Sequence, residues 1–301
     1  MEMKFKAYKD YELNVYVWDE VKSPKAVVQI AHGMAEDAAR YEDFAKFLNS
    51  NGYIVLADDH RAHGKTANGE LGIVPEGGDC YFDTIEDMAL LTDYAKDKYK
   101  LPVILFGHSY GSFLSQGYIE KYSDKIASVV LCGSAKMDTS DTKLGGMVAN
   151  LQNSLFGPNK PAKFIANLSF GNYEKPFKEE HRKFAWGSRN VESCEKYNAN
   201  PMCGFILSIG FYKSFFNGLK QIYGDAPKSI RADLPIYIIS GDKDPVGGMG
   251  VLVKNLFEMY KSLGFNVEMK LYEGARHEIL NELNNQEVYQ DVLKFFEANN
   301  K

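Results

Sequence analysis

A serine between two glycines is the residue whose type and spacing point most directly to chemistry. Gly107, Ser109 and Gly111 form a Gly-x-Ser-x-Gly pattern between an apolar strand pattern over 103–106 and a helical pattern over 110–122. This arrangement is typical of a nucleophile elbow, in which glycines remove Cβ atoms that would collide in the tight turn. We therefore expect Ser109 to project above a sheet at a helix N-terminus, where free N–H groups favour developing negative charge.

A serine hydroxyl becomes a nucleophile when an imidazole takes its proton and a carboxylate orients that imidazole. In this topology the partners follow the serine in the order acid, then histidine, each on a loop after a strand. Of the six histidines, His277 is the one that follows the serine and stands just after an apolar strand pattern. It is the predicted general base.

Two carboxylates, Asp242 and Asp244, follow the apolar run 236–240 and are both candidates for the acid. Periodicity does not choose between them. Pro245 restricts Asp244 to extended conformations, which can hold its short side chain rigidly toward His277. Asp242 lies nearer the start of the turn, where it suits hydrogen bonds to loop N–H groups. Loop geometry therefore favours Asp244.

Acyl transfer also needs N–H donors aimed at the oxyanion. Tyr110 follows the nucleophile and supplies one by its position. The strand pattern over 26–31 ends in His32-Gly33, where the chain turns sharply, so we expect the second donor to be the N–H of Met34. The imidazole of His32 is predicted to be structural and hydrogen-bonded.

Other residues with chemical potential receive structural interpretations. Cys132 ends a strand pattern and is expected to be a buried thiol rather than a nucleophile. The run 58–64 contains Asp, His and Arg and is predicted to be a charge-paired loop. The four cysteines fit no metal-binding spacing, and no glycine loop suited to phosphate is present. We predict neither a metal nor a cofactor.

The elements that must position these residues alternate along the first half of the chain. Helical patterns lie near 37–49, 84–98 and 110–122, and strand patterns cover 12–18, 26–31, 53–57, 103–106 and 126–131. The first strand alternates, as a half-exposed antiparallel strand should, whereas the later ones are apolar on both faces. This order predicts an α/β fold with a mostly parallel central sheet flanked by helices.

The alternation stops near Ser134 and resumes with a strand pattern at 235–240, then a helix near 249–263, a strand at 266–272 and a helix near 284–298. Apolar residues between 136 and 231 follow helical spacing. We expect residues 1–135 and 232–301 to form the core domain, and 136–231 to be an inserted helical cap, or lid, over a pocket.

Composition narrows the function further. The chain has 301 residues, with Lys+Arg 35 against Asp+Glu 40, a net charge of −5, and no long basic block, which argues against nucleic acid. No apolar run approaches the roughly 18 residues of a spanning helix. The first residues lack the apolar stretch of a secretory signal. We therefore expect a cytoplasmic protein with free thiols.

Taken together, five motifs resemble the monoacylglycerol lipase and lysophospholipase branch of the α/β-hydrolases, related to the S33 serine aminopeptidases. The resemblance covers about residues 25 to 296. The motifs are His32-Gly33-Met34-Ala35-Glu36 with Arg40-Tyr41, Asp59-His60-Arg61-Ala62-His63-Gly64, Gly107-His108-Ser109-Tyr110-Gly111, Gly241-Asp242-Lys243-Asp244, and His277-Glu278-Ile279-Leu280-Asn281-Glu282. The resemblance implies an α/β-hydrolase fold, a triad of Ser109, Asp244 and His277, and a capped acyl pocket.

Three positions depart from that family pattern. Family members usually carry His where this chain has Asp37, and Asp where it has Asn190 and Asn200. These positions border the entrance or the cap, so they bear on headgroup preference and cap docking rather than on the reaction.

The leading hypothesis is a serine hydrolase of single-chain acyl esters of the monoacylglycerol or lysophospholipid type. Its expected partner is a small-molecule ester. The protein itself is expected to lack a membrane span but to make transient contact with lipid. The sequence predicts no oligomeric state. One alternative is an aminopeptidase or amidase, which needs a cap carboxylate to receive an amino terminus. The available acids are Glu174, Glu179, Glu180, Glu192 and Glu195. Another alternative is a noncatalytic ligand-binding protein on the same fold.

Overall fold

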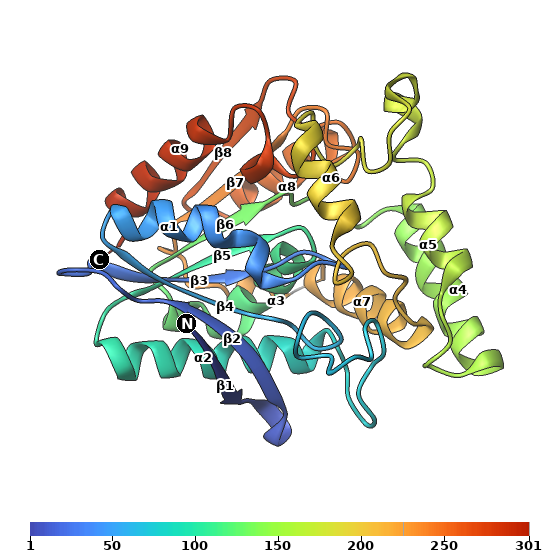
Figure 1. Cartoon of the computed structure of the whole chain (residues 1–301), viewed down its shortest axis with the longest axis horizontal. Helices are drawn as coiled ribbons and strands as arrows, with labels where there is room; N and C mark the ends of the chain where they lie inside the picture. Colours follow the sequence, from blue (N-terminus) through green and yellow to red (C-terminus); the bar gives the residue numbers. More distant parts are fainter. Residues whose placement is uncertain (225, 301) are drawn as a thin grey trace.

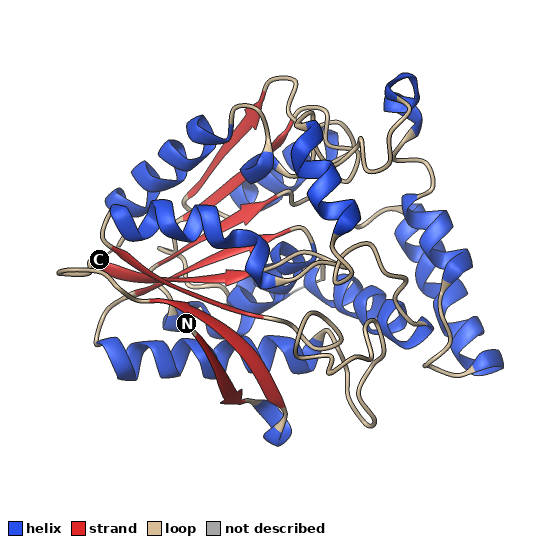
Figure 2. Ribbon diagram, in the orientation of Figure 1, coloured by secondary structure: helices blue, strands red, loops and turns tan. Residues whose placement is uncertain are grey.

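The computed structural model describes residues 1–224 and 226–300, so Asp225 of the inserted segment and the terminal Lys301 lie outside it. An eight-stranded sheet runs through the molecule in the order β1-β2-β4-β3-β5-β6-β7-β8 (Figure 2). The strands are β1 (Glu2–Lys6), β2 (Glu12–Trp18), β3 (Ala26–Ala31), β4 (Tyr53–Asp58), β5 (Val103–His108), β6 (Ser128–Cys132), β7 (Ile236–Gly241) and β8 (Val267–Tyr272).

Strand direction follows the order expected from the sequence. β1 and β2 pair with each other, and β2 with β4, in antiparallel fashion, whereas β4, β3, β5, β6, β7 and β8 are parallel. The parallel strands β3, β4, β5, β6 and β7 are buried along their whole length. The predicted α/β class with a mostly parallel sheet is confirmed.

Helices cover both faces of the sheet and bury two apolar clusters (Figure 1). One cluster contains Met88, Leu114 and Leu256, and the other contains Phe44 and Val292. The first face is covered by α2 (Phe82–Tyr99), α3 (Tyr110–Tyr122) and α8 (Val251–Ser262), and the second by α1 (Glu42–Ser50) and α9 (Asn285–Ala298). Short 3-10 turns are η1 (Tyr8–Asp10), η2 (Ala38–Tyr41), η3 (Ser123–Lys125), η4 (Lys175–Glu180), η5 (Ala226–Ser229) and η6 (Ile279–Asn281).

The N-terminal strands differ from expectation in two ways. β1 was not predicted, because its exposed charged residues interrupt a short alternation centred on Met3 and Phe5. β2 is antiparallel as predicted but is not half-exposed. Its Leu13, Val15 and Val17 join one apolar cluster and Tyr16 joins the other, so both faces are covered.

Between β6 and β7 the chain forms helices that lie beyond the carboxyl ends of the strands, with α4 and α5 outermost in Figure 1. These are α4 (Ser140–Phe156), α5 (Lys163–Phe170), α6 (Val191–Ala199) and α7 (Ile209–Ile222). α4 packs against both α5 and α7, and α7 packs against α3. The inserted segment therefore rests on the helix that begins next to Ser109.

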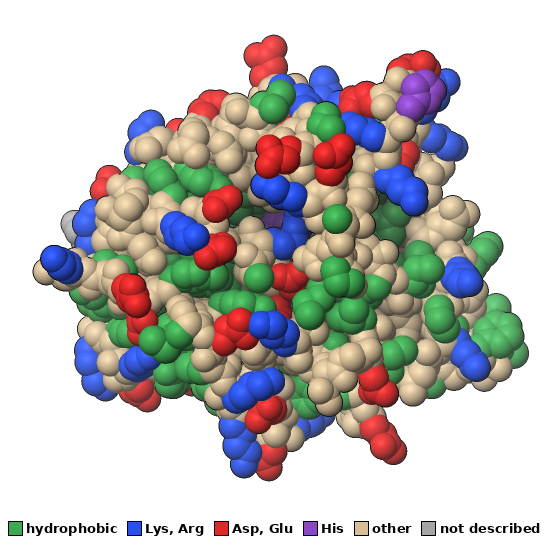
Figure 3. Space-filling view, in the orientation of Figure 1, with side chains coloured by type: hydrophobic (Ala, Val, Ile, Leu, Met, Phe, Trp, Pro, Cys, Tyr) green, Lys and Arg blue, Asp and Glu red, His purple; other side chains and the backbone are tan. Residues whose placement is uncertain are grey.

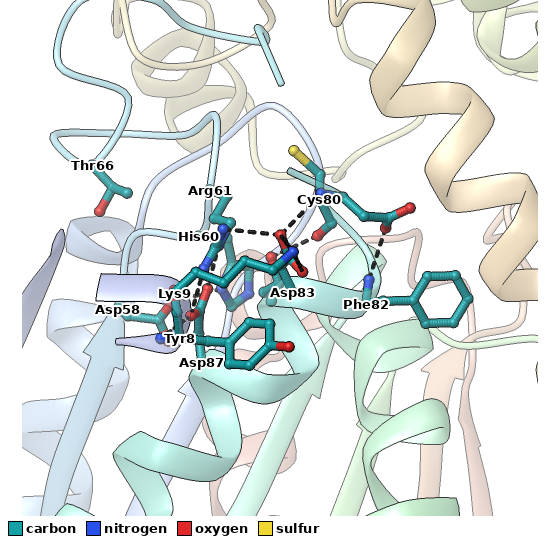
Figure 4. Close-up of polar contacts among 12 residues, drawn as sticks. Tyr8, Lys9, Asp58, His60, Arg61, Thr66, Cys80, Phe82, Asp83 and Asp87 are labelled. Atoms are coloured by element: carbon teal, nitrogen blue, oxygen red, sulfur yellow. Dashed lines mark hydrogen bonds and ion pairs between the residues drawn. The ribbon is translucent and has the colours of Figure 1, made fainter. Parts of the chain in front are cut away.

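The loop after β4 is fixed by buried charges (Figure 4). Arg61 donates from Nε to Asp87 at 2.6 Å and from Nη1 to Asp83 at 3.1 Å, and its Nη2 donates to the carbonyl of Tyr8 at 2.7 Å. Lys9 also bonds Asp83 at 3.0 Å. The charge pairing predicted for this loop is present, and it holds the neighbouring His60 and His63 in place.

Two further sequence expectations can be compared with the structure. Cys132 is a buried free cysteine, as expected. Burial raises the pKa of its thiol well above the usual value. Within residues 1–224 and 226–300, no helix is long and apolar enough to cross a membrane.

Glu120 on α3 has a buried polar atom without a partner: its Oε1 makes no hydrogen bond in the described chain. Burial raises the pKa of this carboxyl from 4.5 to about 9. When the pKa of a carboxyl is higher in the folded than in the unfolded state, its contribution to stability is fully present at pH values below the unfolded-state pKa. That contribution is lost as the pH rises toward the folded-state pKa of about 9.

We therefore predict that Glu120→Gln raises the melting temperature, with a gain that grows between pH 5 and pH 9. Thermal unfolding of both proteins across this pH series measures the effect. Glu86→Gln is the matched control, because the carboxylate of Glu86 already bonds Lys121 and the Tyr122 hydroxyl and should not gain stability. A gain independent of pH would contradict the prediction.

Candidate active site

Ser109 occupies a sharp turn between β5 and α3, with φ 51° and ψ −117°. This region is unfavourable for a residue with a side chain and marks local strain. A Cβ on Gly107 would lie 2.4 Å from the carbonyl oxygen of Gly111, and one on Gly111 would lie 2.0 Å from that of Ala31. Both glycines are therefore required for the helix to begin so close to the sheet.

A series of hydrogen bonds begins at the Ser109 hydroxyl. Its Oγ lies 2.8 Å from Nε2 of His277, and Nδ1 of His277 lies 2.9 Å from Oδ2 of Asp244. The order of groups is the one that a Ser-His-Asp triad requires. The structure thus brings together the three side chains that the sequence placed on separate loops.

Asp244 is fully buried and held by several donors. The Ser240 hydroxyl donates to Oδ2 at 2.9 Å, and the N–H of Val246 donates to Oδ1 at 2.8 Å. Burial opposes ionisation, but His277 and these donors keep the pKa of Asp244 below its usual value. The carboxylate is therefore charged and able to stabilise an imidazolium.

Asp242 lies elsewhere in the same loop. Its Oδ1 accepts a hydrogen bond of 2.8 Å from the N–H of Gly274, which braces the loops after β7 and β8. This is the loop-bracing arrangement expected for Asp242, and the carboxylate that reaches His277 is Asp244.

The loop after β3 passes beside Ser109, and a Cβ on Gly33 would lie 3.2 Å from that of Ser109. The N–H groups of Gly33 and Ala35 donate to Glu36 and His63. In the described chain, the N–H groups of Met34 and Tyr110 donate to no protein atom. Two free donors therefore flank the serine, at the positions predicted for an oxyanion hole.

The imidazole of His32 is structural, as predicted. The N–H of His60 donates to its Nε2 at 2.9 Å, so the proton resides on Nδ1, which donates to the Gly33 carbonyl at 2.7 Å. Burial, together with His60 and His63, holds the pKa of His32 well below its usual value. The ring is therefore neutral and keeps this pattern.

A buried ion network, which was not predicted from the sequence, joins two loops of the site. Arg40 bonds the carboxylate of Glu36 and also makes a two-pronged contact with Glu278, at 2.8 and 2.6 Å. Burial opposes ionisation of Glu278, but Arg40 keeps its pKa below the usual value. The spacing Glu36-x-x-x-Arg40 was a local signal, but Glu278 is 238 residues away.

A cavity of about 800 Å³ opens over Ser109 and His277. Its volume falls in the range of small-molecule sites, and its walls are mainly apolar. Side chains from α3 and the inserted segment form most of the apolar lining: Phe113, Met137, Leu144, Leu168, Phe170, Trp186, Phe205, Tyr212, Phe215, Phe216 and Leu219. The site can therefore hold an apolar chain next to the serine.

Two of the three family departures contact each other. The side-chain amide of Asn200 donates to Oδ2 of Asp37 at 2.8 Å, which ties the inserted segment to the loop after β3. Asn190 caps the N-terminus of α6 by accepting from the N–H of Ser193 at 3.3 Å. Asp37 and Asn200 therefore form a polar contact between the inserted segment and the loop after β3.

The profile of the family described as serine aminopeptidase, S33, matches residues 22–284. The chain belongs to this family.

Several proteins similar to this chain are lipases or esterases. The monoacylglycerol lipase of Mycolicibacterium smegmatis is 29% identical over 284 residues, which cover 93% of this chain and 90% of the relative. The human monoglyceride lipase is 26% identical, over 88% and 80% of the two chains. A thermostable carboxyl esterase from Bacillus coagulans, solved with glycerol, superposes with a TM-score of 0.91 at 27% identity, covering 100% and 99%.

These comparisons confirm the resemblance drawn from the motifs, and the fold is that of an α/β-hydrolase. The protein is a serine ester hydrolase. Among residues 1–224 and 226–300, no group of three or more His, Cys, Asp or Glu side chains is arranged to hold a metal ion.

The two neighbouring aspartates give a direct test of the site. Asp244→Asn is expected to lower kcat by about a thousandfold or more with the fold intact, because an amide favours the wrong imidazole tautomer. Asp242→Asn should instead reduce stability by about 1 kcal/mol, because an amide oxygen accepts the Gly274 N–H more weakly than a carboxylate does. Steady-state kinetics and thermal unfolding of both variants separate the roles; a kinetic loss confined to Asp242→Asn would reverse the assignment.

Proposed function

We propose that this enzyme hydrolyses single-chain acyl esters of the monoacylglycerol or lysophospholipid type through a Ser109 acyl-enzyme. The observation that carries the proposal is the hydrogen-bonded series from Ser109 through His277 to Asp244 at the floor of an apolar cavity. The names of the relatives agree with an ester of glycerol as one substrate.

In the proposed mechanism, Oγ of Ser109 attacks the ester carbonyl while Nε2 of His277 takes the hydroxyl proton. Asp244 stabilises the imidazolium, and the N–H groups of Met34 and Tyr110 bind the oxyanion. His277 then gives its proton to the departing alcohol, which leaves an acyl group on Ser109. A water molecule, deprotonated by His277, attacks this acyl group and releases the carboxylic acid.

The cap supports a substrate with one apolar chain. We propose residues 136–231 as the cap domain and the remainder as the core. Long apolar side chains of α4, α5 and α7 line the cavity. Two acids of its lining near Ser109, Glu36 and Glu278, are both ion-paired with Arg40. An acyl chain fits such a lining better than a charged group does.

The aminopeptidase alternative is less well supported. None of Glu174, Glu179, Glu180, Glu192 and Glu195 is among the residues that line the cavity. Glu174 accepts from the N–H of Phe184, and Glu180 pairs with Arg276. These two acids are therefore engaged elsewhere. A noncatalytic binding role would not require a strained serine that is hydrogen-bonded to His277 and, through it, to Asp244.

Transient contact with a lipid surface is part of the proposal. Exposed apolar side chains gather on the outer faces of α4 and α5, in the region where Figure 3 shows hydrophobic atoms at the surface. They are Leu144, Met147, Leu151, Leu155, Phe156, Phe164 and Leu168. Leu144 and Leu168 also line the cavity, so this face continues into the site. A cytoplasmic location remains a prediction.

Replacing the nucleophile tests the proposed reaction. Ser109→Ala should lower turnover of p-nitrophenyl and glyceryl acyl esters by at least about a thousandfold, with an unchanged melting curve. Fluorophosphonate labelling of the wild type, and its loss in the variant, reports the nucleophile independently. Retention of more than about a tenth of the activity would refute the role of Ser109.

An acyl-length series tests the substrate class. If the apolar cavity holds the chain, kcat/KM should rise by up to about fourfold for each added CH₂ until the cavity is full, because each buried CH₂ contributes about 0.8 kcal/mol. Matched p-nitrophenyl and monoacylglycerol esters of increasing length provide the measurement. A flat or falling series from acetyl upward would exclude the lipid-like class while leaving the hydrolase intact.

A further inference from the structure

The carbonyl of Ala35 joins the loop after β3 to the inserted segment. Ala35 has a φ of 54°, which an alanine adopts only under constraint. Its carbonyl accepts two hydrogen bonds, from the Tyr197 hydroxyl at 3.1 Å and from the N–H of Gly204 at 2.9 Å. Both donors come from the inserted segment, more than 160 residues away in the sequence.

The core fixes the rest of this loop. Nδ1 of His32 donates to the Gly33 carbonyl, and the N–H of Ala35 donates to Nε2 of His63 at 3.0 Å. Because a trans peptide is planar, holding the Gly33 carbonyl points the N–H of Met34 in the opposite direction. The direction of the Met34 donor therefore depends on its own peptide and on the two that follow, the second of which carries the Ala35 carbonyl.

The same part of the inserted segment also contacts the loop after β8, which carries His277. We call residues 184–204 the strap. Near its start, the carbonyl of Gly187 accepts from the N–H of Glu278 at 2.7 Å, and the carbonyl of Ala185 accepts from Arg276 at 2.6 Å. The Trp186 ring lies 5.3 Å from the ring of His277. The strap thus contacts both neighbours of the proposed base at one end and Ala35 at the other.

We propose that the strap aligns the base and the oxyanion donor with each other, and that Tyr197 is the positioning residue for the Met34 N–H. The Tyr197 ring is stacked on Phe184 with centroids 3.8 Å apart, and Arg40 lies 4.9 Å from its centroid. This packing fixes the ring, so its hydroxyl is held on the Ala35 carbonyl. The inference rests on the proposed roles of Ser109 and Met34.

Asn200 strengthens the same attachment. Its amide bonds Asp37, two residues beyond Ala35, and Oδ1 of Asp37 accepts from the N–H of Ala39. The strap therefore holds the loop at two separate points. A substitution at either point should disturb the oxyanion donor while leaving the apolar cavity walls in place.

Tyr197→Phe tests the positioning role, because it keeps the stacked ring and removes only the hydroxyl. We expect kcat on a p-nitrophenyl acyl ester to fall by about tenfold, with KM within about twofold of the wild type. Affinity for an alkyl trifluoromethyl ketone, which forms a tetrahedral oxyanion on serine, should fall by the same factor. Affinity for the matching alkyl ether, which forms no oxyanion, should be unchanged.

Tyr223→Phe is the matched control. It also removes a hydroxyl that donates to a backbone carbonyl, that of Ala135 at 2.9 Å, but Tyr223 is neither part of the loop after β3 nor one of the residues that line the cavity. Its kcat and ketone affinity should match the wild type. Asn200→Ala is a second variant that loosens the same loop, and it should show the same split between ketone and ether.

Three results would overturn the inference. The first is a kcat and a ketone affinity equal to those of the wild type in both Tyr197→Phe and Asn200→Ala. The second is an equal loss of ketone and ether affinity in Tyr197→Phe, which would mean that Tyr197 contacts substrate. The third is a loss in Tyr223→Phe as large as that in Tyr197→Phe. Failure of the proposed function is distinguishable, because Ser109→Ala would then retain activity and the wild type would not bind the ketone covalently.

Discussion

The close approach of α3 to the end of β3 is the constraint on which the site depends. With no side chain at Gly111, the first turn of α3 lies directly against the carbonyl of Ala31. That contact forces Ser109 into its strained turn, and it also brings the loop that follows β3 beside the serine. A single packing arrangement therefore places both the proposed nucleophile and the proposed oxyanion donor.

Charge pairing completes what packing begins. The loops after β3 and β8 lie at different points of the sheet edge, and Arg40 joins them by pairing with both Glu36 and Glu278. Removing one member would leave a buried charge without a partner, which is strongly destabilising. Asp244 is the remaining buried carboxylate beside Ser109, and its charge is available to His277 because Arg40 is engaged elsewhere.

Much of this architecture could be predicted from the sequence because it is local or follows from chain order. The helix predicted at 110–122 is α3, and the acid and histidine were found from their positions just after apolar strands. β1 was missed because an exposed edge strand shows only a short alternation. The contacts of Asn200 with Asp37 and of Tyr197 with Ala35 join residues 163 and 162 positions apart. No local pattern encodes such contacts, since they form only when the inserted segment docks.

The proposed reaction requires that Ser109 carries the acyl group during turnover. The most direct measurement is rapid-quench intact-mass analysis of the enzyme mixed with excess p-nitrophenyl acyl ester, followed by peptide mapping. We expect a mass increase of one acyl group that forms within the first turnover and maps to Ser109. An acyl group on Cys132, Cys203 or another residue, or turnover by the wild-type enzyme without any covalent species, would contradict it.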